Sequence, residues 1–177
     1  MIKCINTYDD PVLLVKAVPC VPFLQTLTSS ISEEHSNSIW TQDIIDLVQD
    51  LKDTAESLEN CAGLASNHIW DLKDGPPPAV FVLKFTWAGT VNNPITQWFE
   101  FINPIVKTTG KTIKLSEGCF SLPGYTNARV KREANVIITY QTLASLETNT
   151  LKLMSKDNFG AIAAQHEYDH LKGKLIV

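Results

Sequence analysis

The sequence predicts one α+β domain over residues 1–177, in which mostly antiparallel sheets pack around a C-terminal helix and a long amphipathic helix lies nearer the N-terminus. Three observations lead to this fold class. A chain of 177 residues is long enough for one well-buried domain and short for two. One long segment has apolar residues at helical spacing. Several short β-type segments separated by turn residues follow it, with no internal repeat or low-complexity linker.

The N-terminal third combines an irregular arm with the long helix. Residues 1–37 contain three prolines and then a polar stretch, which indicates an extended arm and a loop. From Ile39 to Asn60, apolar residues recur at helical spacing with Asp and Lys between them. These apolar residues are Trp40, Ile44, Leu47, Val48, Leu51, Ala55 and Leu58. We therefore predict one amphipathic helix over residues 39–60, packed on the core.

Five segments rich in Val, Ile, Leu and aromatic residues predict the strands, which are residues 79–87, 97–102, 111–115, 134–140 and 151–154. Turn residues separate them. A Gly-Pro-Pro-Pro turn at 75–78 precedes the first strand, and Asn103-Pro104 is expected to end the second. Thr109-Gly110 and residues 147–149 are predicted turns between later strands.

Composition excludes several classes of function. The net charge of -4 and the pI near 5.5 provide no basic patch for nucleic acid. No apolar run reaches the length of a membrane span. The N-terminus lacks a basic region followed by an apolar core, so we expect a cytoplasmic protein. The four cysteines have no Cys-x-x-Cys spacing, which argues against a zinc finger or a thioredoxin-type redox site.

The pattern His-Glu-x-x-His occurs near the C-terminus, at His166, Glu167 and His170. Its flanks favour a helix. Three alanines at 161, 163 and 164 are strong helix formers, Ser155 or Asp157 can cap the start, and Gly173 suits the end.

Residues four apart lie on one helix face, so His166 and His170 can point both imidazoles at a single metal ion. Glu167 projects near that ion without binding it, which suits a general base acting on metal-bound water. The alternative is a surface helix that holds two histidines by chance. An open catalytic site normally has three protein ligands, so a third one is expected elsewhere.

Cys119 is the candidate for that third ligand. It is flanked by Gly118 and a short polar segment, so an extended or turning backbone can deliver its thiolate to an ion held by the helix. Two histidines and one cysteine leave one open position on a tetrahedral ion. Taken alone, Cys119 is more often a buried structural thiol.

Three segments resemble the motifs of peptide deformylases. Residues 117–121, Glu-Gly-Cys-Phe-Ser, look like the family's Glu-Gly-Cys-x-Ser motif, and residues 165–170, Gln-His-Glu-Tyr-Asp-His, match its Gln-His-Glu-x-Asp-His motif. Residues 61–68 occupy the place of the family's Gly-x-Gly-Leu-Ala-Ala-x-Gln motif, with Cys61 replacing the first Gly and His68 the Gln. The three blocks occur in the family's order and at similar separations, so the resemblance spans nearly the whole chain.

The resemblance implies an iron(II) enzyme that removes the formyl group from the formyl-methionine of new polypeptides and releases formate. Zinc or nickel is also able to bind two imidazoles and a thiolate. The implied metal ligands are Cys119, His166 and His170. Glu167 is the implied acid and base. The backbone N–H of Phe120 and the side chain at position 68 are the implied oxyanion donors, and a His there makes that stabilisation differ from the family's.

Pocket residues follow from geometry. Phe159, Ile162 and Ala163 share the helix face of His166, so they are predicted to floor an apolar pocket for a methionine side chain. Ordinary core packing is the alternative for each. The small residues Ala62, Gly63 and Gly118 are predicted to expose backbone groups that pair with an extended peptide.

Three charged residues near the motifs are further candidates. Asp169 is close enough in sequence to orient a histidine ligand or a neighbouring loop. Arg129 and Arg132 follow the cysteine segment and are candidates for contact with peptide carbonyls. Simple solvation is the alternative for all three.

Two other functions stay open from the sequence. One is a weakly active or inactive module that binds formylated N-termini, which His68 favours and Glu167 opposes. The other is a His-Glu-x-x-His metallopeptidase, which the cysteine ligand opposes. The expected partners are N-formylmethionyl peptides, with neither nucleic acid nor membrane. The resemblance also suggests the ribosome, although the chain stops at Val177, before the C-terminal helix through which longer relatives are thought to contact it.

Overall fold

The computed structural model describes residues 1–22, 40–90, 93–125, 128–154 and 159–177. Its centre is one five-stranded sheet in the order β1-β2-β3-β4-β5, and every neighbouring pair is antiparallel. The bounds are β1 Gly63–Ala65, β2 Val80–Thr90, β3 Asn93–Glu117, β4 Ala128–Thr142 and β5 Ser145–Met154. The described residues form a single domain with this sheet and two α-helices, α2 Gln42–Ser57 and α3 Gly160–His170. Short 3-10 helices lie at η1 Pro11–Leu14, η3 Ser66–His68 and η4 Leu72–Asp74.

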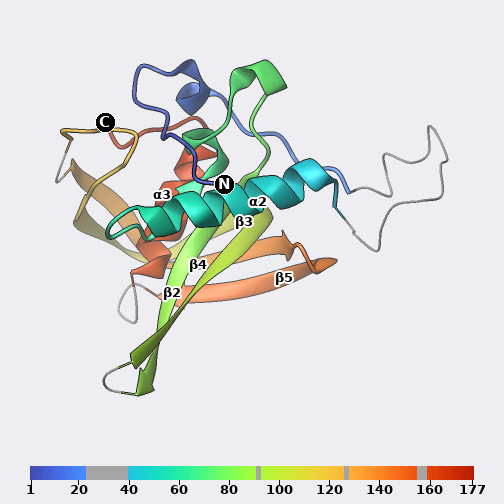
Figure 1. The fold of residues 1–177 in the computed structure, drawn as a ribbon. Helices are drawn as coiled ribbons and strands as arrows, with labels where there is room; N and C mark the ends of the chain where they lie inside the picture. Colours follow the sequence, from blue (N-terminus) through green and yellow to red (C-terminus); the bar gives the residue numbers. More distant parts are fainter. Residues whose placement is uncertain (23–39, 91–92, 126–127, 155–158) are drawn as a thin grey trace.

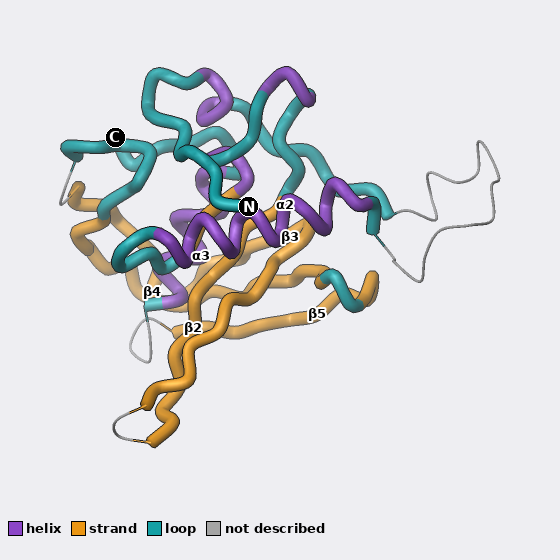
Figure 2. The backbone as a smooth tube through the Cα atoms, viewed as in Figure 1, coloured by secondary structure: helices purple, strands orange, loops and turns teal. Residues whose placement is uncertain are grey.

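The two α-helices cover opposite faces of the sheet (Figures 1 and 2). Alternation along β2 explains this arrangement, because successive side chains of a strand point to opposite faces. Val80 and Val82 join the buried cluster that contains the apolar residues of α2. Phe81 and Leu83 join the cluster that contains the alanines of α3. Since both faces of β2 are buried where the strand begins, residues 80–83 form a continuous apolar run.

The predicted helix over 39–60 is shorter in the structure. It begins at Gln42 after the N-cap Thr41 and ends at Ser57. Leu58 has extended backbone angles, and Asn60 has a positive φ of 60°, which an α-helix does not accommodate. Asn60 therefore turns the chain toward β1, and the helix ends at Ser57, three residues before the predicted end.

The predicted strands at 97–102 and 111–115 are parts of one strand, β3, so Asn103-Pro104 does not end it. The register shifts between Ile102 and Ile105, where Asn103 has a φ of 50°. A β-bulge absorbs the proline there. The Asn103 side chain fixes this bulge, because Nδ2 donates to the carbonyl of Cys20 at 3.0 Å and Oδ1 accepts the Cys20 N–H at 2.7 Å. A second bulge surrounds Gly110, between Thr109 and Thr112.

The last two strands are longer than predicted. β4 extends the expected 134–140 at both ends, and β5 includes residues 147–149, which were predicted as a turn. Repeated pairing with β4 holds these polar residues in the sheet. The predicted helix caps Ser155 and Asp157 lie outside the described residues, and α3 begins at Gly160 after Phe159, which makes no side-chain capping bond.

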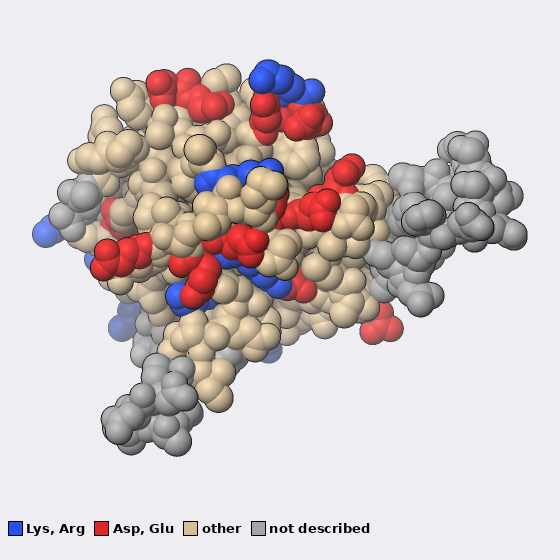
Figure 3. Space-filling view, in the orientation of Figure 1, with Lys and Arg blue, Asp and Glu red and all other residues tan. Residues whose placement is uncertain are grey.

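Surface charges are mixed. On the face that carries α2, Lys and Arg side chains are interspersed with Asp and Glu (Figure 3). One such pair is Lys52 with Glu100, at 2.5 Å. Among the helices in the described ranges, none has the length and apolar character that a bilayer span requires.

Candidate metal centre

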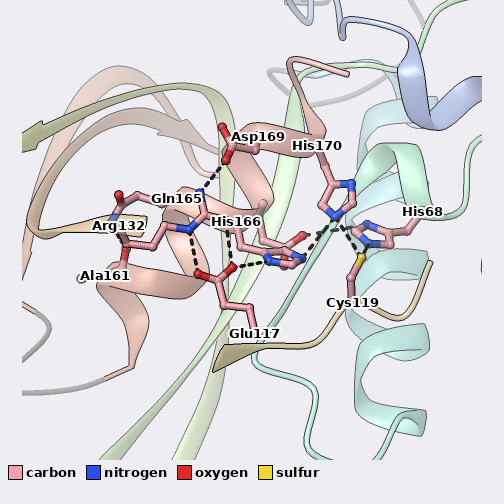
Figure 4. Close-up of polar contacts among 10 residues, drawn as sticks. His68, Glu117, Cys119, Arg132, Ala161, Gln165, His166, Asp169 and His170 are labelled. Carbon is pink, nitrogen blue, oxygen red and sulfur yellow. Dashed lines mark hydrogen bonds and ion pairs between the residues drawn. The ribbon is translucent and has the colours of Figure 1, made fainter. Parts of the chain in front are cut away.

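Helix α3 carries the His-Glu-x-x-His pattern inside the protein rather than on its surface. Ala161 and Ala164 are fully buried against the sheet, and so small a side chain allows the helix to approach it closely. His166 and His170 are buried too, and their Nε2 atoms lie 3.3 Å apart. The i, i+4 spacing thus brings the two imidazoles together, as Figure 4 shows. The alternative of a surface helix is wrong for this stretch.

Cys119 reaches the same point from the end of β3. Glu117 is the last residue of that strand, and the chain then turns through Gly118. The Cys119 Sγ atom lies 3.3 Å from His170 Nε2. A thiol delivered from an extended strand therefore meets the two imidazoles from the helix (Figure 4).

A fourth donor, His68, stands beside these three. It ends η3, is 1% exposed, and places Nε2 3.9 Å from Cys119 Sγ. The ligand atoms of His68, Cys119 and His170 all lie within 4.8 Å of one another, and His166 joins this group through its contact with His170. The His68 Nδ1 atom lies within hydrogen-bond distance of both the N–H and the carbonyl oxygen of Ala65, at 3.1 and 3.2 Å.

The chemistry of this donor set fits a divalent transition-metal ion. Burial lowers the pKa of His166, but hydrogen bonds to Cys119 and Glu117 outweigh burial and raise it to about 10. Two imidazoles and a thiolate are suitable ligands for iron, zinc or nickel, and in the folded protein they are already clustered.

Glu117 orients the first histidine. Its Oε2 accepts a hydrogen bond from His166 Nδ1 at 2.9 Å, which directs Nε2 of that ring toward His170. Arg132 holds Glu117 in turn through two bonds of 2.8 Å and reaches Asp169 with its third nitrogen at 2.5 Å. Although burial opposes its ionisation, Glu117 has a pKa lowered to about 2 because Arg132 and His166 bind the carboxylate.

This network changes two sequence-based expectations. Arg132 does not extend toward a peptide, because its guanidinium is 6% exposed and lies among acidic partners. Asp169 acts on the centre only through Arg132, and the carboxylate that orients His166 is Glu117. The sequence offered one signal for Glu117, its place two residues before Cys119. The sequence offered no signal that paired Glu117 with Arg132.

Glu167 is the other buried carboxylate of the site. It is 4% exposed, and burial raises its pKa to about 7 against the opposing effect of His166. Among the described residues, its Oε2 atom has no hydrogen-bond partner within bonding distance. A group with these properties can both accept and return a proton near neutral pH. That is the chemistry expected of a general base.

A cavity of about 460 Å³ opens in front of the cluster. Its lining includes the residues predicted to form the methionine pocket or to pair with the peptide backbone, namely Ala62, Gly63, Gly118, Phe159, Ile162 and Ala163. Arg129 and Arg132, the candidates for contact with peptide carbonyls, are not among the lining residues. His68, Cys119, Phe120, His166 and Glu167 also line the cavity. His170 lies behind this wall and is 1% exposed. Ile162 is buried whereas Phe159 and Phe120 are exposed, so the cavity has an apolar floor and an aromatic rim. The individual roles of these residues stay predictions.

Gly63 lies where a side chain would displace Glu167. A Cβ atom added at position 63 would lie 2.8 Å from Leu83 Cδ2 and 2.9 Å from Glu167 Cγ. Since Leu83 is fully buried, the added methyl group has little room. We expect Gly63→Ala to lower the midpoint of thermal unfolding and to reduce turnover by moving the carboxylate. A Cβ at Gly118 meets nothing within 4 Å, so Gly118→Ala is the control for stability. Equal midpoints for the two variants would contradict this.

Comparison with known proteins agrees with the motifs. A family model described as polypeptide deformylase matches residues 2–177. A peptide deformylase of Karelsulcia muelleri is 32% identical over 142 residues, covering 77% of this chain and 65% of that protein. Peptide deformylase 3 of Shewanella oneidensis is 33% identical over 133 residues, covering 73% of this chain and 70% of the relative.

Solved structures have the same fold. The Met-Ala-Ser-bound crystal structure of a class I type b peptide deformylase from Acinetobacter baumannii has a TM-score of 0.71 at 20% identity, covering 99% of this chain and 96% of that one. Peptide deformylase from Thermotoga maritima has a TM-score of 0.69 at 23% identity, covering 99% and 95%. The family resemblance inferred from three short motifs is thereby confirmed over nearly the whole length.

Proposed function

This chain belongs to the polypeptide deformylase family, and from that premise we propose that it is a metal-dependent hydrolase that removes the N-formyl group from formyl-methionyl peptides and releases formate. One observation carries the proposal. Three donors suited to a transition metal, from Cys119, His166 and His170, meet at contacts of 3.3 Å beside the buried carboxylate of Glu167 and at the wall of a cavity.

We propose Cys119, His166 and His170 as the residues that hold the ion. When bound, the ion supplies Lewis acidity that polarises the formyl carbonyl and acidifies water. Because its pKa is about 7, Glu167 exists in part as the carboxylate near neutral pH, and this form takes the proton from the attacking water. The same group then returns the proton to the leaving amine. The N–C bond of the formamide breaks, and formate and a free N-terminal amine are the products.

The developing oxyanion needs a hydrogen-bond donor close to the ion. We propose the backbone N–H of Phe120 for this role, because Phe120 follows Cys119 directly and lines the cavity. The side chain of His68 was expected from the sequence to supply a second donor. That role requires the tautomer with the proton on Nε2 and with Nδ1 accepting from the Ala65 N–H.

The edge strand of the sheet is the proposed place for the substrate to bind. β1 is an edge strand, so its outer side is available for pairing with an extended peptide. We propose that Ala62 and Gly63 on this edge, with Gly118 opposite, bind the peptide backbone. The cavity floor at Ile162 and Ala163, with Phe159 at the rim, then receives the methionine side chain. The bound Met-Ala-Ser of the Acinetobacter relative is a peptide of the proposed kind.

Iron(II) is the proposed ion, with zinc or nickel able to substitute, since all three accept imidazole and thiolate ligands. Proposed partners are N-formylmethionyl polypeptides in the cytoplasm, and contact with the ribosome stays a prediction.

We expect the anaerobically purified iron(II) protein to release formate from formyl-Met-Ala-Ser. Removing the metal with a chelator should abolish release, because water without an ion is too weak a nucleophile at neutral pH. Adding iron(II), nickel or zinc back should restore it to differing degrees. The assay measures formate directly, and peptide-bond cleavage is followed in the same samples by mass spectrometry. Cleavage of peptide bonds without formate would identify a peptidase, and absence of both from metal-loaded protein would refute the proposed activity.

A further inference from the structure

We propose that His68 is a fourth protein ligand of the metal in the resting protein, bound through Nε2 beside Cys119, His166 and His170. The inference rests on the proposed metal centre and extends it. It concerns the position where this chain departs from its family's motif, and it follows from the placement of His68 within the donor cluster rather than from that motif.

The donor atoms have a spacing close to that of ligands on one ion. A tetrahedral site with metal–nitrogen bonds of about 2.05 Å and a metal–sulfur bond of about 2.3 Å separates two nitrogens by about 3.3 Å and a nitrogen from the sulfur by about 3.6 Å. The Nε2 atoms of His166 and His170 are 3.3 Å apart. The Cys119 sulfur is 3.3 Å from His170 Nε2 and 3.9 Å from His68 Nε2, values that bracket the expected separation. The separation of His68 from the sulfur is therefore close to that of two ligands on one ion, and the ligand atoms of His68 and His170 lie within 4.8 Å of each other.

The segment that carries His68 is held rigidly by hydrogen bonds. The Ser66 hydroxyl donates to the carbonyl of Pro78 at 2.6 Å, and the Asn67 amide donates to the carbonyls of Val12 and Val15. The His68 carbonyl accepts the N–H of Asn6 at 2.7 Å. The turn is thus fixed on several sides, and the imidazole packs on the ring of His170 with centroids 4.1 Å apart. Such preorganisation lowers the cost of ordering a ligand.

The other ring nitrogen of His68, Nδ1, has a hydrogen-bond acceptor within reach. Metal-bound histidines usually donate their second ring N–H to an acceptor. The Ala65 carbonyl oxygen lies 3.2 Å from His68 Nδ1 and is such an acceptor. This tautomer is the opposite of the one that an oxyanion donor needs, in which Nδ1 accepts the Ala65 N–H, and it leaves the lone pair of Nε2 facing the cluster.

A fourth protein ligand would keep solvent from binding the ion. Three histidines and a cysteine complete a four-coordinate ion, an arrangement typical of closed sites, whereas a catalytic site keeps a position for water. In the resting protein His68 would occupy that position, so it would have to leave the ion before water can bind there for hydrolysis. A small anion in solution would then find no free site on the ion, and it would find one once His68 is replaced.

Zinc X-ray absorption on the wild-type protein tests this without a variant, because outer-shell scattering counts the histidines bound per zinc. We expect three histidines and one sulfur in the wild type, and two histidines and one sulfur in His68→Gln and His68→Ala. As a second measurement, azide is titrated into the cobalt(II)-loaded proteins. The visible spectrum of the wild type should stay unchanged, and the spectra of both variants should shift.

Two histidines per zinc in the wild type, or an azide response equal to that of His68→Gln, would overturn the inference. Circular dichroism and metal content establish that each variant is folded and loaded. Formate release is measured separately, so the two proposals fail independently. A site with three histidines and no formate would refute only the activity, and formate release with two histidines would refute only the fourth ligand.

Discussion

A Glu167→Gln variant with wild-type metal content is expected to release formate about a hundredfold to ten-thousandfold more slowly than the wild type, the range typical for loss of a general base. The amide has nearly the same shape as the carboxylate but cannot take a proton. Glu117, the other buried carboxylate at the centre, cannot replace it, because Arg132 and His166 occupy its oxygens and hold its pKa at about 2. Single-turnover formate release measures the effect.

Glu59→Gln is the matched control for this prediction. Glu59 also lines the cavity, but it is exposed and lies at the rim, away from the donor cluster. Removing its charge should leave the rate close to that of the wild type. If Glu167→Gln keeps its metal and still turns over at the rate of Glu59→Gln, Glu167 is not the base.

The sequence predicted the parts of the centre that depend on local geometry. His166 and His170 could be assigned to one face because helical spacing alone determines it, and the same reasoning placed Phe159, Ile162 and Ala163 on the cavity wall. Cys119 joins them in the prediction because the helix supplies only two ligands, and the family motif supports that choice. No local pattern states that the end of β3 meets helix α3.

The parts that sequence reasoning missed depend on contacts between distant segments. Arg132 has the ordinary appearance of a strand arginine. The pairing of β3 with β4 sets it opposite Ile113, and its side chain then reaches along the sheet to Glu117. Asn103-Pro104 has the composition of a strand end, but the bonds of Asn103 with Cys20 turn it into a bulge inside β3. Such tertiary hydrogen bonds override local propensity, and single-residue patterns do not contain them.

Replacing Arg132 is expected to have the largest effect on stability. In the Arg132→Met variant, Glu117 would remain buried without its guanidinium partner. Breaking a buried ion pair from one side typically costs about 3–5 kcal/mol. Here both groups are buried, with side-chain exposures of 6% and 3%, so solvent does little to compensate. Urea unfolding of the metal-free protein measures the loss, and metal affinity should also fall by about 10- to 100-fold because Glu117 no longer orients His166.

Two further variants separate the charge from the geometry. Arg132→Lys keeps a cation but cannot make the paired bonds of 2.8 Å to both carboxylate oxygens, so we expect an intermediate loss. The double variant Arg132→Met, Glu117→Gln removes both charges and should recover stability relative to Arg132→Met alone, because no unpaired ion is left in the interior. Its metal affinity should stay low, since a neutral amide is a weaker partner for His166 than a carboxylate.

A loss of stability below about 1 kcal/mol in Arg132→Met would contradict the prediction, because it would place this pair with ordinary surface ion pairs.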